Sequence, residues 1–217
     1  MSSIGVGVMS ESLEKASAHE LAINWLNAFE NALVTNDMVA VDELFVEDSY
    51  WRDLVAFTWR LSTFSGLGNI NAAMREFVLP ARPKNIQLAV DRTPPRWVNR
   101  VGVDTIEAIF CFETNSGKGT GLLRLVPAPE SNRGFAAWVL LTTLDEIKGH
   151  EEQIGERRPR GEEWSGGFGS ENWMDIRTRQ MAYEDRDPAV VVIGGSQCGL
   201  GIAASLGVLG VDTLVID

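Results

Sequence analysis

The end of the chain carries a pattern that few folds accommodate: an apolar strand, a glycine-rich turn, a helix and a second apolar strand in succession. The first strand is Val190 to Ile193, the turn is Gly194 to Gly199, and the second strand is Thr213 to Ile216. A helix between two such strands carries the chain back to its starting edge, so the strands are expected to pair in parallel. The sequence therefore predicts the first β-α-β unit of a parallel α/β domain over residues 188–217.

The glycine-rich turn predicts a dinucleotide-binding site. A glycine suits the tight turn at Gly194, and another suits close packing of helix on strand at Gly199. The free N–H groups and positive dipole end of the following helix favour a pyrophosphate. Asp217 ends the second strand, where a carboxylate accepts hydrogen bonds from a ribose hydroxyl. The predicted cofactor-binding residues are Gly194, Gly195, Ser196, Gln197, Cys198, Gly199 and Asp217.

Ser196 departs from this fingerprint, because it stands where the second glycine is expected. Its Cβ narrows the approach of a pyrophosphate, whereas its hydroxyl can donate a hydrogen bond to a phosphate. A purely structural interpretation stays open, in which the glycines only allow helix and strand to pack closely. Cys198 is interpreted as a small apolar filler of the turn. The residues alone do not separate FAD from NAD, since both carry the same adenosine ribose.

The residues before this unit predict a separate α+β domain. Ser17 and Glu20 have capping-box spacing and open a long amphipathic helix. Shorter helices are predicted over Met38–Phe45 and Ile70–Leu79. Strands are predicted over Lys84–Val90, Thr105–Glu113, Thr120–Val126 and Phe135–Leu144. This order predicts helices packed on a curled sheet of long antiparallel strands.

Composition limits the classes of function. A net charge of −11 offers no basic footprint, so we expect no nucleic-acid and no membrane partner. Cys111 and Cys198 are the only cysteines, and His19 and His150 lie far apart, so no disulfide scaffold and no metal site are predicted. The chain has no apolar run of about 18 residues, and Met1 to Ser17 carries no basic segment followed by a long apolar one, so we expect no export signal. We expect a soluble, cytoplasmic protein that acts on a small-molecule substrate.

Several stretches of the chain resemble a known family. The run Asp187–Leu200, together with Leu214–Asp217, looks like the FAD-binding start of flavin-containing monooxygenases. The runs Asp48–Leu54, Leu141–Glu146 and Gly149–Glu151 are similar to members that carry an additional N-terminal domain. That domain is of the nuclear-transport-factor-2-like (NTF2-like) type, also called SnoaL-like or polyketide-cyclase-like.

The resemblance implies FAD and NADPH as cofactors and the oxygenation of a small organic substrate. It implies a cone-shaped NTF2-like domain followed by the start of a truncated Rossmann FAD-binding domain. The expected divisions are a flexible terminus over 1–16, the α+β domain over 17–148, a connector over 149–187 and the incomplete FAD domain over 188–217. The NADPH site is expected outside this chain, so the fragment alone is expected to be inactive, with no catalytic residue assigned.

A polar and aromatic cluster leaves two interpretations of the first domain open. In an extended strand, Trp51 and Asp53 share one face while Tyr50 and Arg52 share the other. An inward Asp53 beside Trp51 suits the general base of a cyclase-like or isomerase-like enzyme. Alternatively, Arg52 and Asp53 form ion pairs and hydrogen bonds on a rim strand of an accessory domain that forms a homodimer through its exposed sheet face. His19, in the first helical turn, is interpreted as a surface residue.

Overall fold

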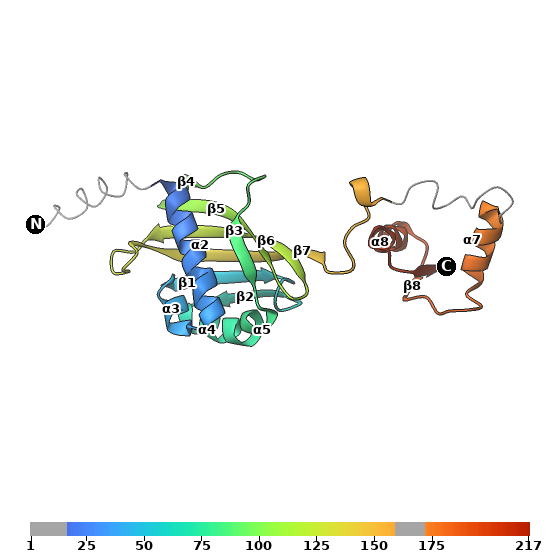
Figure 1. Ribbon diagram of the computed structural model, residues 1–217, viewed down its shortest axis with the longest axis horizontal. Helices are drawn as coiled ribbons and strands as arrows, with labels where there is room; N and C mark the ends of the chain where they lie inside the picture. Colours follow the sequence, from blue (N-terminus) through green and yellow to red (C-terminus); the bar gives the residue numbers. More distant parts are fainter. Residues whose placement is uncertain (1–16, 159–171) are drawn as a thin grey trace, which may run out of the picture. The chain divides into compact units, whose positions relative to one another are not determined.

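The computed structural model describes residues 17–158 and 172–217, and internal contacts divide the chain into two units (Figure 1). The first unit ends at Ile147 and the second begins at Lys148. The terminus predicted to be flexible, residues 1–16, lies outside the described residues. So do residues 159–171 of the expected connector. The two units are described separately below.

Helices of the first unit gather on one side of its sheet (Figure 1). Their bounds are α2 (Ala18–Thr35), α3 (Met38–Asp42), α4 (Leu67–Ala73), the π-helical turn η1 (Met74–Val78) and α5 (Leu79–Ala81). The predicted capping box is confirmed, because Ser17 Oγ accepts from the Glu20 N–H at 3.1 Å and Glu20 Oε2 accepts from the Ser17 N–H at 3.4 Å. The second predicted helix ends early, since Phe45 already begins a strand.

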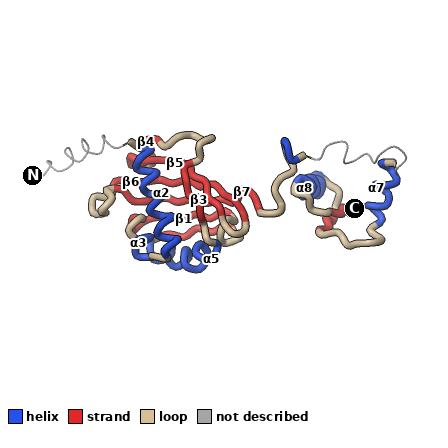
Figure 2. The backbone as a smooth tube through the Cα atoms, in the orientation of Figure 1, coloured by secondary structure: helices blue, strands red, loops and turns tan. Residues whose placement is uncertain are grey.

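Seven strands form the sheet, in the order β2-β1-β7-β6-β5-β3, with β4 also paired to β5 (Figure 2). Their bounds are β1 (Phe45–Leu54), β2 (Leu61–Ser65), β3 (Lys84–Leu88), β4 (Arg96–Arg100), β5 (Val103–Glu113), β6 (Gly117–Pro127) and β7 (Phe135–Ile147). The predicted antiparallel meander is β5-β6-β7. Strand β1 was expected only as the extended run from Tyr50 to Asp53. Strands β2 and β4 were not predicted, because all of their residues are exposed or half-buried.

The core lies between the sheet and the helices. Ile106, Ala108, Phe110 and Phe112 of β5 are all buried, as their alternation predicts. On the helical side, the Trp25 ring stacks on Phe29 with centroids 4.9 Å apart. The Trp25 side chain also donates to the Leu44 carbonyl at 2.8 Å, which joins α2 to the start of β1. The expected α+β fold with a curled sheet is therefore confirmed.

The second unit contains the strand, helix and strand that the sequence predicts. The elements are η2 (Gly155–Arg157), α7 (Trp173–Ala182), β8 (Val190–Ile193), α8 (Gln197–Val208) and β9 (Thr213–Ile216). Strands β8 and β9 pair in parallel, from Val190 opposite Thr213 to Ile193 opposite Ile216. Helix α7 lies within residues 149–187, which were expected to form a connector. Asn172 caps the helix by accepting hydrogen bonds from the N–H groups of Met174 and Asp175.

The β-α-β unit leaves much apolar surface open. Ile193 is 85% exposed, and Val191, Leu200 and Ile202 are also exposed. Among the described residues of this unit, only Val192 and Gly199 are buried. Parallel strands are normally buried on both faces of a sheet, and the apolar residues of β8 and β9 are typical of such strands. No described helix of either unit has both the length and the apolar character needed to cross a bilayer.

Candidate functional site

The glycine-rich turn between β8 and α8 has the geometry that its sequence predicts. Gly194 has a φ of +101°, a conformation that L side chains rarely adopt. Its N–H donates to the Ile216 carbonyl at 2.7 Å, which carries the β8-β9 pairing into the turn. A glycine at this position therefore follows from the backbone conformation.

Gly199 lets the first turn of α8 approach β8 closely. A Cβ at this position would overlap the carbonyl oxygen of Gly194 and lie 3.3 Å from Val192 Cγ1. Gly201, two residues further along the same helix, has no atom within 4 Å of a Cβ built there. The requirement for glycine is thus confined to one turn of the helix. Gly199 thus allows the N-terminus of α8 to lie against the end of β8. A pyrophosphate bound there would contact the free N–H groups of α8.

Ser196 is the N-cap residue of α8, but its hydroxyl makes no capping hydrogen bond. Its backbone is extended, with φ −72° and ψ 179°. The exposed side chain is therefore not engaged by the helix and remains a donor for another group. Cys198 is exposed too, so its interpretation as an apolar filler is wrong.

Asp217 lies against the turn. Its Oδ1 accepts a hydrogen bond from the Gly195 N–H at 3.1 Å, and the carboxylate lies 3.4 Å from a Cβ built on Gly195. The structure therefore brings Gly194, Gly195, Gly199 and Asp217 together. Gln197 begins α8 at the same end. This is the arrangement of glycines, helix N-terminus and carboxylate that the sequence predicts for this turn.

A polar cluster at the other end of β9 was missed at the sequence level. Asp212 accepts from the Tyr183 hydroxyl and from Arg186 Nε, both at 2.9 Å, and the Arg186 guanidinium lies 4.6 Å from the Tyr183 ring centroid. Burial and the hydrogen bond to Asp212 raise the pKa of Tyr183, while the hydrogen bond from Arg186 lowers the pKa of Asp212. Asp212 is 29 residues from Tyr183 and 26 from Arg186, so the three residues form no local pattern. They tie the end of α7 to β9.

In the first unit, Asp53 is fully buried and faces inward, on the same side of β1 as Trp51. Its Oδ2 accepts from the N–H groups of Phe57 and Thr58, at 3.1 and 2.8 Å, and from Thr58 Oγ1 at 2.7 Å. Its Oδ1 accepts from Thr142 Oγ1 at 2.7 Å. Arg52 faces the opposite side and donates to Thr63 Oγ1 at 3.2 Å. The expected hydrogen bonds of both residues are therefore present, but Arg52 and Asp53 do not pair with each other, because neighbouring strand residues point apart.

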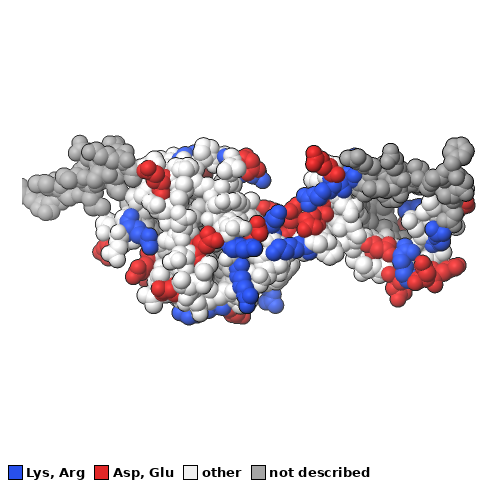
Figure 3. Space-filling model, in the orientation of Figure 1, with Lys and Arg blue, Asp and Glu red and all other residues white. Residues whose placement is uncertain are grey.

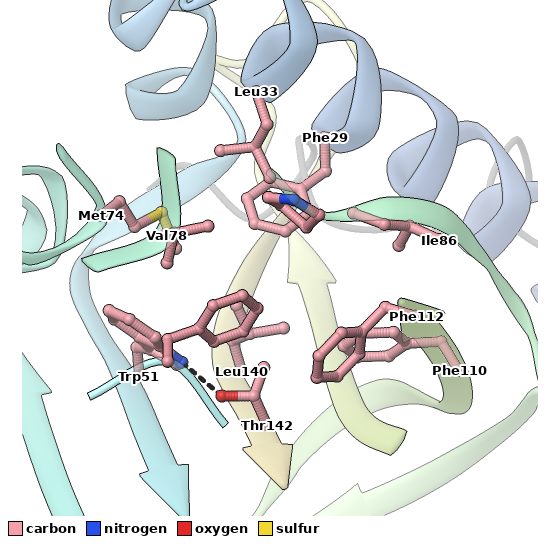
Figure 4. A pocket seen from close by; sticks show the side chains of 12 residues that line it. Phe29, Leu33, Trp51, Met74, Val78, Ile86, Phe110, Phe112, Leu140 and Thr142 are labelled. Atoms are coloured by element: carbon pink, nitrogen blue, oxygen red, sulfur yellow. Dashed lines mark hydrogen bonds between the residues drawn. The ribbon is translucent and has the colours of Figure 1, made fainter. Parts of the chain in front are cut away.

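The interior of the first unit is almost filled. A cavity of about 10 Å³ lies among aromatic and aliphatic side chains, including Trp51, Phe57 and Phe112. Figure 4 shows the Trp51 indole N–H donating to Thr142 Oγ1, a bond of 3.0 Å. Such a volume holds about one water molecule. The interior of the first unit therefore has no room for a substrate of ordinary size in this conformation. The expected surface position of His19 is confirmed, because it lies exposed on α2.

The outer face of the sheet carries a second cluster that the sequence analysis missed. Glu107 on β5, whose side chain is 10% exposed, contacts Arg100 at 3.0 Å, Arg124 at 3.0 Å and Arg96 at 3.4 Å. Burial alone would raise the pKa of Glu107, but hydrogen bonds and charges of Arg100 and Arg124 hold it below the ordinary value. Figure 3, drawn from the side on which α2 lies in front of the sheet, shows acidic and basic side chains interspersed among uncharged ones.

No protein-family model matches the chain, and no curated protein matches it. Among solved structures, the chain is similar to an NTF2-like protein with a cystatin-like fold from Novosphingobium aromaticivorans, at 15% identity and a TM-score of 0.42, over 66% of this chain and 92% of that one. An NTF2-like superfamily protein from Salmonella enterica matches at 13% identity and a TM-score of 0.42, over 64% and 96%. An NTF2-like protein of unknown function from Pseudomonas putida matches at 8% and 0.41, over 71% and 100%. None of these three descriptions names a flavin or an oxygenase. The α+β architecture itself is shown by the strand order of the sheet and by its packing against the helices.

Proposed function

We propose that the second unit binds the ADP portion of FAD and that this protein belongs to a flavin-dependent, NADPH-using monooxygenase. The observation that carries the proposal is the cradle formed by Gly194, Gly195, Gly199 and Asp217 at the N-terminus of α8. A purely structural role explains Gly199. It does not explain an uncapped helix N-terminus with a free serine hydroxyl and a carboxylate beside it.

The residues present fit FAD in the following way. The N–H groups at the start of α8 and the Ser196 hydroxyl would hold the pyrophosphate. Asp217 would exchange its hydrogen bond from Gly195 for one from the ribose. When bound, FAD would supply the two-electron chemistry that passes electrons from NADPH to dioxygen. No described residue is assigned to NADPH or to the substrate, whose class is a small organic molecule.

A titration monitored by NMR tests the cradle. ADP should shift the amide signals of Gly195, Ser196 and Gln197, whereas adenosine should leave those of Ser196 and Gln197 nearly unchanged, because only ADP carries the pyrophosphate. Gly199→Ala should weaken ADP binding by about tenfold, since a displaced helix costs roughly 1–3 kcal/mol. Gly201→Ala is the matched control and should bind ADP normally.

Two results would contradict the proposal. One is an absence of shifts at Gly195 to Gln197 with ADP at any concentration. The other is equal binding by the two glycine variants, which would show that the approach of α8 to β8 has no part in it. The amide signals of β8 and β9 report in the same spectra whether the second unit of each variant remains folded, and those of the first unit serve as an unchanged internal reference.

A second function, homodimerisation through the outer face of the first unit, is favoured by the distribution of side chains there. Leu141, Leu122 and Ile109 are directly paired across β7, β6 and β5 and form a half-buried apolar row. Along the strands, the three arginines around Glu107 lie on one side of the row, and Glu113 and Asp145 lie on the other, together with Lys84 and Lys118. A two-fold axis through Leu122 would stack the apolar rows of two copies and place the arginines of one copy on the side of the other that carries Glu113 and Asp145.

Sedimentation tests this second proposal. The wild-type chain should dimerise in the micromolar range, and Leu122→Glu should be monomeric because it buries a charge in the apolar row. Val39→Glu is the matched control, since Val39 is 70% exposed on α3. A wild-type chain that stays monomeric, or equal dissociation by both variants, would rule the interface out.

A further inference from the structure

The loop between β1 and β2, residues 55–60, closes the interior of the first unit. Ala56, Phe57 and Thr58 are buried, whereas Trp59 is 55% exposed. The Phe57 ring stacks on Phe112 with centroids 5.2 Å apart and lies edge-on to Trp51 at 6.1 Å. Phe57 also lines the 10 Å³ cavity. Its ring therefore fills space that would otherwise extend this cavity.

The closed loop is strained at two positions. Val55 has a φ of +58° and Trp59 a φ of +56°, both in the left-handed region. This region is costly for a β-branched residue such as valine. The Val55 N–H nevertheless donates to the Arg60 carbonyl at 3.0 Å, so the ends of the loop are held together. The strain favours any rearrangement that releases these two residues.

Asp53 holds the loop closed against this strain. Three of the four hydrogen bonds that its carboxylate accepts come from the loop, from the Phe57 N–H, the Thr58 N–H and Thr58 Oγ1, and all three reach Oδ2. The fourth comes from Thr142 Oγ1 on β7 and reaches Oδ1. Release of the loop would leave Oδ2 without a donor in an apolar interior. That state is unfavourable unless another donor replaces the loop.

We propose that residues 55–60 are a releasable plug, and that the space vacated by Phe57 binds a small molecule with an aromatic ring and a hydrogen-bond donor. The ring would take over the contacts of Phe57 with Trp51 and Phe112. The donor would replace the loop at Asp53 Oδ2. This inference concerns the first unit and does not depend on flavin binding by the second.

Amide hydrogen exchange tests the plug in the intact chain. The Phe57 and Thr58 amides should exchange by local opening, faster than the core amides of Phe110 and Phe112. Val55→Gly should slow this exchange about tenfold, because glycine adopts a left-handed φ without the cost borne by valine. Asp53→Asn should speed it, since an amide oxygen accepts these hydrogen bonds less strongly than a carboxylate.

Ligand binding tests the vacated space, with phenol and toluene as probes of equal size. Phe57→Ala should bind phenol about tenfold more tightly than the wild type, because the plug no longer has to be displaced. Phe135→Ala is the matched control, a buried phenylalanine outside the cavity lining. Phenol should bind Phe57→Ala more tightly than toluene does, and adding Asp53→Asn should reduce that preference.

The proposal is overturned if the Phe57 and Thr58 amides exchange only with global unfolding, at the rate of Phe110 and Phe112. It is also overturned if phenol binds Phe57→Ala no better than Phe135→Ala. Should Phe57→Ala fail to fold, the exchange rates of the wild type and of Val55→Gly decide the matter alone. Equal exchange in those two proteins would count against the plug.

Discussion

At the scale of single residues, two buried polar groups of the first unit differ in whether their hydrogen bonds are made. The Asp53 carboxylate is fully buried and accepts four hydrogen bonds. Ser49, four residues earlier on β1, is also fully buried. Its hydroxyl nevertheless has no hydrogen-bond partner among the described residues. A buried group stabilises a fold only when its hydrogen bonds are made, so these two positions should respond differently to substitution.

Ser49→Ala should leave the free energy of unfolding unchanged or raise it by up to about 1 kcal/mol, because it removes an unpaired buried hydroxyl. Thr142→Val is the comparison variant. It should lower that free energy by about 1–3 kcal/mol, since it leaves Trp51 Nε1 and Asp53 Oδ1 unpaired. Urea unfolding measures both. A loss in Ser49→Ala as large as in Thr142→Val would mean that the serine hydroxyl has a partner.

The cluster around Glu107 predicts a dependence of stability on pH. The folded-state pKa of Glu107 is lowered, so its stabilising effect is present above the unfolded-state pKa, about 4.3. The effect is lost as pH falls through the folded-state pKa. Glu107→Gln should therefore lower the melting temperature at pH 7, and this effect should shrink as pH falls through the folded-state pKa of Glu107. Glu113→Gln, which removes a single 4.0 Å ion pair to Lys84, should change the melting temperature at pH 7 less than Glu107→Gln does. A pH-independent difference would contradict this account.

At the scale of elements, glycines of β6 lie opposite phenylalanines of β5. Gly121 pairs with Phe110 and Gly119 with Phe112 across β6 and β5. A Cβ at either glycine would overlap the ring of its partner. The rings therefore lie over the backbone of β6, which lets large side chains fill the interior without pushing the strands apart.

Gly121→Ala should lower the free energy of unfolding by about 1–3 kcal/mol, because the new methyl group overpacks against the Phe110 ring and the Leu141 carbonyl. Gly68→Ala is the matched control. Its Cβ meets no atom within 4 Å on α4, so the change should be neutral or stabilising. Thermal unfolding of the two variants tests the difference, and equal melting temperatures would show that β6 can shift at no cost.

At the scale of the whole molecule, the two units differ in how much they bury. The apolar core of the first unit is a continuous cluster drawn from α2, the short helices and the sheet, all within that unit. The second unit exposes most apolar residues of β8 and α8. Stability should follow burial, so the first unit should be the more stable one.

Removal of residues 148–217 should leave the melting temperature of the first unit within a few degrees of that in the intact chain. Its core contains no residue from the removed part. Differential scanning calorimetry measures both proteins, and limited proteolysis of the intact chain should cut the second unit first. A large drop in melting temperature after the removal would mean that the core depends on the second unit.

Local patterns determined those features that the sequence predicts correctly. The capping box at Ser17, the alternation along β5 and the order of strand, turn and helix after Val190 are each written within a few neighbouring residues. The candidate nucleotide cradle could be predicted for the same reason, with Asp217 placed by the length of one β-α-β unit. Helix and strand periods follow from backbone geometry, so such segments need no knowledge of distant contacts.

Only the tertiary structure decided the contacts between distant residues. Asp53 and Thr142 are separated by 89 residues and meet because β1 pairs in parallel with β7. Glu107 gains its three arginines from β4 and β6, and Asp212 gains Tyr183 from the end of α7. The sequence shows which side chains share a face of one strand. It does not show which strands become neighbours, because that choice depends on the packing of the whole sheet and its helices.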